Sequence, residues 1–327
     1  MTDLIILGNG MAGMTAALYA KRANLNFKII GKDEFDFGQI GNAILVENYP
    51  CSESLSGFEL ATKLHDQLLT NSVEIEEHTV KKVIYKNDGT FLIEYEDGTI
   101  DHSKTVVYAL GATPRQLNCK IDEDISIHYC ALCDGSLYKN KTVAVIGGGD
   151  SAFTQAEYLS KICENVYIVM CDNNITANKS LETRIKNINN IQIIFNSPIN
   201  YIRKKNNKYL LTPFEKEENK LYSLYGITVD GVFVSIGMKP NTNPIEHFLF
   251  LENGYIYSDE YCATSVPGFF AAGDVRTKQL RQSITAAADG ANAIQSVINY
   301  LNLERVKNEN KWKYCISIRN ICRPPKK

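Results

Sequence analysis

Short apolar runs that lead through glycine-rich turns into helical segments mark the N-terminal part of the chain. Residues 4–7 form an apolar run of strand length, and the turn 8–13 follows at once. The segment 14–23 then has a helical pattern, and 27–30 is a second apolar run. Strand, glycine turn, helix and strand in this order are typical of a dinucleotide-binding unit. The pattern therefore predicts a nucleotide site at the start of the first helix.

Three glycines in this turn match what a bound pyrophosphate requires. Gly8 allows the tight turn, Gly10 lets the backbone approach the phosphates, and Gly13 lets the helix pack closely on the strand. The free N–H groups at the helix N-terminus favour the bound anion further. The acidic residue that usually binds the ribose is missing, because Gly31 stands at the end of the second strand and acids follow only from Asp33 onward.

An alternating pattern of apolar and polar residues follows at 81–110. Turn sequences at 87–89 and 96–98 interrupt the alternation, which predicts an antiparallel meander inserted into the first unit. We expect residues 106–110 to return to a buried strand that ends at Gly111 and Ala112.

The same architecture recurs in the middle of the chain. Residues 142–146 are apolar, Gly147 and Gly149 lie in the following turn, and Ala152 precedes a helix at 153–161. Further strands are expected at 166–170, 191–195, 208–213, 221–228 and 232–236. The sequence thus predicts an α/β protein with two doubly wound, Rossmann-like dinucleotide-binding domains, each with an antiparallel β-meander insertion. Two nucleotides in one chain point to electron transfer, for example from a hydride donor to a flavin.

One CxxC motif lies between the two units. Cys130 and Cys133 are spaced for a short-loop disulfide, and Asp134 is placed to move the proton that thiol–disulfide exchange requires. The alternative is half of a zinc site with His128 as a third ligand. The sequence has no second CxxC and no paired histidines to complete a tetrahedral shell, so we favour the redox interpretation and expect no metal.

Composition and charge narrow the classes of function. The 327 residues are enough for two domains, and 44% hydrophobic with 22% charged residues exclude intrinsic disorder. A net charge of −2 provides no general attraction for nucleic acid or acidic membranes. No apolar run approaches membrane-span length, and nine cysteines, an odd number, argue against a disulfide framework. We expect a cytoplasmic protein that binds neither nucleic acid nor membrane.

Taken together, these motifs resemble the low-molecular-weight thioredoxin reductase family of FAD-dependent enzymes. The resemblance extends to about residue 302 and includes the segments 8–13, 38–40, 47–50, 130–135, 237–242, 270–275 and 281–287. It implies a discontinuous FAD-binding domain at 1–113 and 242–304, and a disulfide-carrying domain at 114–241. Residues that it places at the FAD are Gly8, Gly10, Gly13, Gln39, Asn48, Gly273, Asp274, Arg281, Gln282 and Ser283.

The resemblance also implies roles for the dithiol. Cys133 would meet the flavin, Cys130 would attack the disulfide of a thioredoxin-like protein, and Asp134 would be the acid–base residue. It further implies a homodimer. Two alternatives stay open: an oxygen-dependent dithiol oxidase and a non-catalytic flavin redox sensor, although the intact dithiol counts against the sensor.

The second nucleotide site departs from the family pattern. Members that use NADPH carry a His-Arg-Arg cluster and a further Arg, where this chain has Met170, Cys171, Asp172 and Thr176. A 2′-phosphate depends on charge-assisted hydrogen bonds, so their loss removes most selectivity for NADPH. Asp172 would instead accept the 2′-hydroxyl of NADH. The alternative is that no nicotinamide binds at all, as in the ferredoxin-dependent flavin thioredoxin reductases, which the loss of cationic residues resembles. The donor therefore stays open among NADH, NADPH and reduced ferredoxin.

The C-terminus is basic, whereas the rest of the chain is acidic. Residues 303–327 hold eight Lys and Arg against two Glu, a net charge of +6, which leaves −8 for the remainder. We treat 305–327 as a basic tail. It is either a solvated terminus or a docking segment for an acidic partner such as ferredoxin.

Overall fold

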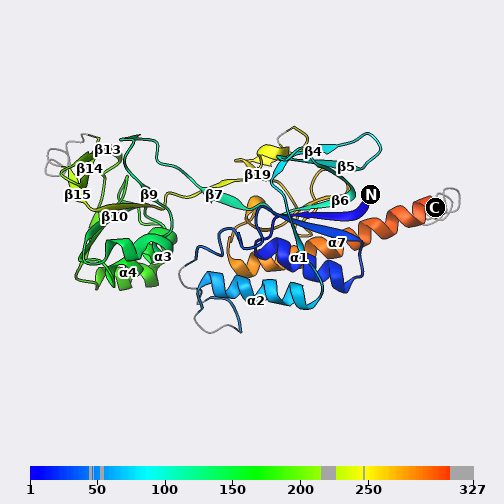
Figure 1. Cartoon of the computed structure of the whole chain (residues 1–327), viewed down its shortest axis with the longest axis horizontal. Helices are drawn as coiled ribbons and strands as arrows, with labels where there is room; N and C mark the ends of the chain where they lie inside the picture. Colours follow the sequence, from blue (N-terminus) through cyan, green and yellow to red (C-terminus); the bar gives the residue numbers. More distant parts are fainter. Residues whose placement is uncertain (44–45, 47, 52–54, 215–225, 246, 310–327) are drawn as a thin grey trace, which may run out of the picture.

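The computed structural model describes residues 1–327 apart from 44–45, 47, 52–54, 215–225, 246 and 310–327, and without the side chains of 132–133 and 305–309. The chain forms two lobes, which Figure 1 shows side by side. The first lobe is built on a seven-stranded sheet, and the second on a five-stranded and a four-stranded sheet. The predicted α/β class with two Rossmann-like units is confirmed.

The main sheet of the first lobe is parallel where it carries the glycine turn. Its strand order is β3-β2-β1-β6-β5-β4, and β20 pairs with β6. Leu4, Ile5, Ile6 and Leu7 of β1 are all fully buried, because helices and loops cover both faces of the sheet. The elements of this part are β1 (Thr2–Leu7), α1 (Met11–Arg22), β2 (Phe27–Gly31), α2 (Gly57–Thr70), β3 (Ile75–Glu77), β20 (Phe269–Ala271), η4 (Gly273–Val275) and α7 (Ser283–Glu309).

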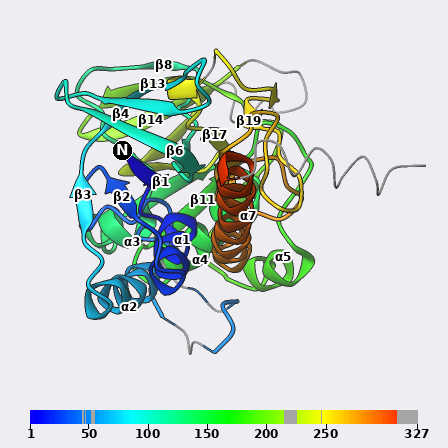
Figure 2. The same cartoon turned by 90° about the vertical axis from the view of Figure 1, so that its right-hand side faces the viewer.

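Helices α1 and α7 lie side by side across this sheet, as Figure 2 shows. A Cβ atom at Gly290 of α7 would lie 2.2 Å from the carbonyl oxygen of Ala12, so only glycine permits this close packing. The contact brings the start of α7 next to the start of α1. The chain segment 281–286 therefore reaches the same site as the glycine turn, although some 270 residues separate them.

The predicted meander is present as β4 (Val80–Tyr85), β5 (Phe91–Tyr95) and β6 (Ile100–Tyr108). The predicted buried strand at 106–110 is confirmed over 106–108, where it forms the buried end of β6. β6 is one strand of nine residues, antiparallel to β5 over its first half and parallel to β1 and β20 over its second. The hydroxyls of its buried Ser103 and Thr105 donate to the backbone oxygens of Thr105 and Asp3.

The second lobe repeats the parallel unit. Its five-stranded sheet has the order β12-β11-β10-β16-β9. A four-stranded sheet has the order β15-β14-β13-β8, in which β15, β14 and β13 are antiparallel and β8 pairs with β13 in parallel. The predicted strand at 221–228 lies partly outside the described residues, and β15 covers its end. The elements are β8 (Lys120–Ile121), β9 (Ile127–His128), α3 (Ala131–Asp134), η1 (Gly135–Tyr138), β10 (Thr142–Ile146), α4 (Asp150–Ser160), β11 (Asn165–Val169), α5 (Lys179–Lys186), β12 (Ile191–Ile194), β13 (Ile199–Lys205), β14 (Lys208–Pro213), β15 (Ile227–Val229) and β16 (Gly231–Val234).

Two antiparallel strands join the lobes: β7 (Ala112–Pro114) and β17 (Met238–Pro240). The Tyr108 hydroxyl donates to the Asn241 carbonyl at 2.7 Å, and the Asn241 amide donates to the Leu110 carbonyl at 2.8 Å. The domain limits expected after 113 and 241 fall at this connection and stay a prediction. The remaining short elements are η3 (Asn243–Ile245), β18 (Leu251–Glu252) and β19 (Tyr255–Ile256).

Helix α7 continues to Glu309, so residues 305–309 of the predicted tail are helical. The rest of the predicted tail, from 310, lies outside the described residues. None of the helices that the structure describes combines the length and the apolar character that a membrane span requires.

Candidate active site

A cavity of about 780 Å³ opens at the carboxyl ends of the parallel strands of the first lobe. This is where ligands bind in doubly wound sheets. Eight of the residues predicted to bind a flavin line it: Gly8, Gly10, Gln39, Gly273, Asp274, Arg281, Gln282 and Ser283. The cavity therefore gathers residues from four segments that the sequence analysis identified separately: 8–13, 38–40, 270–275 and 281–287.

The glycine turn forms one wall of this cavity. Gly8 has φ +108°, and a Cβ there would lie 2.3 Å from the Ala109 carbonyl oxygen. Gly13 does not line the cavity, but a Cβ on it would lie 1.7 Å from the Gly8 carbonyl oxygen. A Cβ on Gly10 would come no closer to the protein than 3.5 Å, from the Phe37 carbonyl oxygen. Gly8 and Gly13 thus serve chain packing, whereas the space beside Gly10 belongs to the cavity.

The missing ribose acid has a structural explanation. A Cβ at Gly31 would lie 2.7 Å from the Asn9 side chain, whose amide donates to the Asp33 carbonyl at 2.8 Å. Asn9 therefore occupies the space beside the end of β2, and its hydrogen bond to Asp33 holds the segment that follows this strand. Asp33 turns away, since its carboxylate accepts from the Phe35 N–H. The acidic side chain that lines the cavity here is Asp36, which no spacing rule had indicated.

The opposite wall carries buried polar atoms that lack a hydrogen-bond partner among the described residues. Asp274 Oδ1 and Arg281 Nε are buried and have no hydrogen-bond partner among the described residues. The Lys278 ammonium lies 3.3 Å from Asp274 Oδ1 as an ion pair, and the Arg281 guanidinium lies 4.0 Å above the ring of Tyr255. Buried polar atoms in native proteins are normally bonded, so these atoms fit a ligand rich in hydroxyl and phosphate groups. FAD meets this description.

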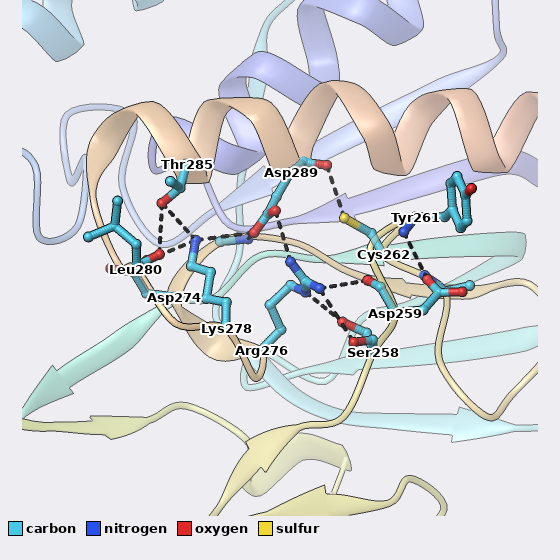
Figure 3. A network of polar contacts seen from close by, with 12 residues as sticks. Ser258, Asp259, Tyr261, Cys262, Asp274, Arg276, Lys278, Leu280, Thr285 and Asp289 are labelled. Carbon is cyan, nitrogen blue, oxygen red and sulfur yellow. Dashed lines mark hydrogen bonds and ion pairs between the residues drawn. The ribbon is translucent and has the colours of Figure 1, made fainter.

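A buried network of charges supports this wall, as Figure 3 shows. Asp289 of α7 accepts from the Arg276 guanidinium at 2.9 Å, from the Lys278 ammonium at 3.1 Å and from the Gly273 N–H at 3.0 Å. Arg276 also donates to the Ser258 hydroxyl at 2.6 Å. Because every charge is paired, the network holds the segment 273–278 against the start of α7.

Asn48 is exposed and stands outside the cavity lining. Its amide donates to Gln282 Oε1 at 3.0 Å, so it touches the site through a residue that does line the cavity. Sequence reasoning did not assign these other lining residues to the site: Lys32, Asp36, Phe37, His78, Thr79, Val80, Ser151 and Asn241. Ser151 comes from the second lobe, and nothing in its sequence context could have indicated that contact.

The CxxC segment lies on the side of the second lobe that faces this cavity (Figure 1). Cys130 is disulfide-bonded, and its Sγ lies 3.6 Å from the carbonyl oxygen of Asn42, a residue of the cavity wall. The side chain of Cys133, on α3, is outside the described residues. Asp134 ends α3 and lies 2.8 Å from His128. The structure thus brings Cys130 and the cavity wall together from different lobes.

His128 does not fit the zinc interpretation. Its Nδ1 lies 2.8 Å from Asp134 Oδ2 and its Nε2 lies 2.7 Å from the Tyr138 hydroxyl, so both ring nitrogens have partners. Among the described residues, no group of three His, Cys, Asp or Glu side chains is arranged to hold a metal ion. Burial raises the pKa of Cys163 to about 11 and of Cys262 to about 12, which keeps these thiols protonated and inert.

The second glycine turn has the same backbone design as the first, but different side chains surround it. Gly147 has φ +145° and packs on the Ser235 carbonyl, where a Cβ would lie 2.1 Å away, and the buried Ala152 adjoins it. The Thr176 hydroxyl donates to the Gly148 carbonyl at 3.2 Å. Asp172 is exposed, and its carboxylate accepts from the Asn174 N–H.

Comparison with known proteins identifies the family. The family model described as pyridine nucleotide-disulphide oxidoreductase matches residues 2–290. A thioredoxin reductase of Mycoplasma genitalium is 35% identical over 303 residues, which cover 90% of this chain and 94% of that protein. The crystal structure of Lactococcus lactis thioredoxin reductase in its FR conformation is similar with a TM-score of 0.82 and 29% identity, covering 92% of this chain and 99% of that one.

A second solved structure, thioredoxin reductase of T. acidophilum, has a TM-score of 0.80 and 32% identity over 92% of this chain and 98% of that one. The resemblance to low-molecular-weight thioredoxin reductases is confirmed. The chain belongs to the pyridine nucleotide-disulphide oxidoreductase family, as its two nucleotide-binding units and the disulfide segment between them require.

Proposed function

We propose that this chain is a flavin-dependent disulfide reductase that passes electrons from FAD through Cys130 and Cys133 to a thioredoxin-like protein. The contact of Cys130 Sγ with the carbonyl of Asn42, at the wall of the cavity, carries the proposal. It places a redox-active sulfur beside a site with the chemistry of a flavin nucleotide. Family membership favours reduction over the dithiol oxidase and over the non-catalytic sensor.

FAD would be held by the residues that line the cavity. The backbone at Gly8 and Gly10 and the N-terminus of α1 would bind the pyrophosphate. Asp274 would accept a hydrogen bond from a hydroxyl of the ribityl chain. The start of α7, with Arg281, Gln282 and Ser283, would face the flavin ring together with Gln39, and Asn48 would hold Gln282. When bound, FAD supplies the two electrons that restore the dithiol.

Reduction of the substrate would proceed by two thiol–disulfide exchanges. The Cys130 thiolate attacks one substrate sulfur, the substrate S–S bond breaks, and the electron pair leaves on the other substrate sulfur, which takes a proton. Cys133 then attacks the Cys130 sulfur of the mixed disulfide and releases the first substrate sulfur, which takes the second proton. Asp134 accepts and returns these protons. Two electrons and two protons reach the substrate, and Cys130 and Cys133 form a disulfide.

The second lobe would accept a nicotinamide donor without selecting for a 2′-phosphate. Gly147, Gly149 and Ala152 form the turn, but the positions after β11 hold the exposed Cys171 and Asp172 in place of cations. Asp172 would accept the 2′-hydroxyl of NADH and repel the 2′-phosphate of NADPH. Reduced ferredoxin is the other donor class. It would dock on the basic tail, 305–327, whose residues from 310 lie outside the described range. The homodimer and the cytoplasmic location stay predictions.

The decisive experiment combines two dithiol variants with flavin spectroscopy. Cys130→Ser and Cys133→Ser should each abolish reduction of oxidised thioredoxin, by more than about a hundredfold, and retain full FAD content, because the thiols relay electrons and do not hold the cofactor. A thiolate next to oxidised flavin gives a long-wavelength charge-transfer band. The band should persist in Cys130→Ser and disappear in Cys133→Ser.

Wild-type protein titrated anaerobically with NADH, NADPH and reduced ferredoxin in turn provides the reference, with flavin bleaching as the readout. Thioredoxin reduction that survives both substitutions would contradict the proposed function. The reverse pattern of charge-transfer bands would exchange the roles of Cys130 and Cys133.

A further inference from the structure

We propose that His128 is a positioning residue for Asp134, and that Tyr138 holds the imidazole in the tautomer that donates to the carboxylate. The inference rests on the proposed function and assigns two residues to the proton transfers of its dithiol step. The three side chains form a linear chain of hydrogen bonds, from Tyr138 through His128 to Asp134. We call these residues the relay triad.

The relay triad joins three elements that meet beside the CxxC segment. His128 lies on β9, Asp134 ends α3, and Tyr138 ends η1. Nδ1 of His128 is 2.8 Å from Asp134 Oδ2, and Nε2 is 2.7 Å from the Tyr138 hydroxyl. Both distances are short enough for strong hydrogen bonds. The imidazole therefore connects the proposed acid–base residue to the interior of the second lobe.

The surrounding packing leaves the imidazole little freedom. Its side chain is 12% exposed, and its ring lies 5.2 Å from that of Phe233 and 5.4 Å from that of Tyr138. A Cβ at Gly231 would lie 2.3 Å from the Tyr138 ring, so strand β16 lacks a side chain where the phenol is seated. The side chain of Asp134, by contrast, is 37% exposed.

The hydrogen-bonding capacities of the three groups determine where the protons lie. An ionised carboxylate only accepts, so Nδ1 of His128 must donate to Asp134. In the neutral ring Nε2 then carries a lone pair, and the Tyr138 hydroxyl must donate to it. Burial, with smaller effects of Tyr209, Asp134 and Asp230, raises the pKa of Tyr138 to about 12, so the phenol keeps its proton. Asp134 thereby makes Nδ1 of His128 a donor, and the lone pair left on Nε2 makes the Tyr138 hydroxyl a donor.

The consequence lies in the proton transfer at Asp134. A hydrogen bond from Nδ1–H favours the ionised carboxylate and fixes its direction, and this is the form that accepts the Cys130 proton before attack. The same carboxyl group then returns that proton to the leaving sulfur of the substrate. Among the described residues, two other charged groups act on Tyr138: Asp230, and Lys141, whose ammonium lies 5.7 Å from the centre of the Tyr138 ring. Neither is hydrogen-bonded to the imidazole.

The test measures the dithiol step without any electron donor. Chemically reduced protein is mixed anaerobically with oxidised thioredoxin, and the exchange rate is recorded from pH 5 to pH 9. His128→Leu should lower the rate at neutral pH about tenfold and move the acidic limb of the profile to higher pH by about one unit, with unchanged KM and FAD content. His128→Asn keeps a donor near the position of Nδ1 and should stay within about threefold of wild type.

Tyr138→Phe keeps the ring packing and removes only the phenol oxygen. It should lower the rate about threefold and shift the profile in the same direction, even if His128→Leu fails to fold. Tyr201→Phe is the matched control, because its hydroxyl donates to the Asp122 carboxylate at 2.7 Å elsewhere in the same lobe. This control should leave both the rate and the profile unchanged.

A double-variant cycle shows whether His128 acts through Asp134. In an Asp134→Asn background, His128→Leu should have no further effect, because the group that it positions is already gone. A second tenfold loss in that background would overturn the inference, as would pH profiles of His128→Leu and Tyr138→Phe identical to wild type.

A second measurement distinguishes failure of the proposed function from failure of this inference. The rate of Cys130 alkylation by iodoacetamide, followed by peptide mass spectrometry in the reduced Cys133→Ser protein, needs no protein substrate. His128→Leu should slow alkylation at neutral pH about tenfold there too. A wild type that does not reduce thioredoxin but shows this effect would overturn the proposed function and retain the inference, whereas an alkylation rate indifferent to His128 would overturn the inference alone.

Discussion

The two glycine turns of this chain share a backbone design and differ in what surrounds them. At the first, Gly10 borders a cavity of about 780 Å³, and Asp274 and Arg281 contribute buried atoms that lack a hydrogen-bond partner among the described residues. At the second, Thr176 bonds to the Gly148 carbonyl, and the next strand is followed by an exposed acid in place of cations. A strand, glycine turn and helix thus define where a nucleotide would lie, while distant segments decide which one binds.

The largest expected effect comes from the same substitution in both turns. Gly10→Val should reduce FAD content to less than about a tenth of wild type, because the side chain fills space that belongs to the cavity. Gly149→Val, the matched variant, should retain full FAD and lose only reduction by nicotinamides. Absorbance of the purified proteins near 450 nm measures both. Loss of flavin from Gly149→Val would mean that the two turns are not independent sites.

A smaller effect is expected at the opposite wall of the first site. Asp274→Asn should weaken FAD binding about tenfold, since the amide cannot accept a ligand hydroxyl as strongly as the carboxylate. Fluorescence titration of the apoprotein with FAD measures the affinity. Asp259→Asn is the control, because this exposed carboxylate of the same lobe bonds only to nearby N–H groups in its own turn. Equal affinities of the two variants would remove Asp274 from the site.

The second site is tested by restoring charge. Replacing Cys171 and Asp172 together by Arg should lower the KM for NADPH about tenfold and leave that for NADH within about threefold, because guanidinium groups bind a phosphate with charge-assisted hydrogen bonds. Steady-state kinetics with both donors provide the measurement. Wild-type flavin that bleaches rapidly with micromolar NADPH would already refute the argument from missing cations.

The smallest effect concerns α5, the helix that begins shortly after Thr176, whose hydroxyl is bonded to the second glycine turn. Hydrogen bonds from Lys179 and Lys186 lower the pKa of Glu182 to about 2. Because the folded pKa is below the ordinary value of 4.5, the stabilisation is present above pH 4.5 and is lost as the pH falls toward 2. Glu182→Gln should lower the melting temperature by about 1–2 °C at pH 7. The difference should shrink below pH 4, and the exposed Glu164→Gln should show neither effect.

Several features were correctly predicted because they depend on neighbours in the chain. The strands β1, β2 and β10 and the glycine turns follow from local apolar runs and from backbone conformations that favour glycine. The structure adds that the last strand of the meander and the buried strand at 106–108 are one strand, β6, in which backbone oxygens of the folded sheet accept from Ser103 and Thr105. Helix α2 was not predicted at all, although Ser56 and Glu59 form a capping box at its start.

The sequence by itself determined the two nucleotide-binding units, the CxxC between them and the family, since these depend on residue type and short spacing. Only the tertiary structure decided that Asn9 replaces the ribose acid beside Gly31, that Cys130 meets Asn42, and that His128 links Asp134 to Tyr138. Such contacts depend on strand order and on how closely elements pack. The physical reason is that a side chain's hydrogen-bond partners are set by the three-dimensional arrangement of the strands and helices that carry them, which no local pattern encodes.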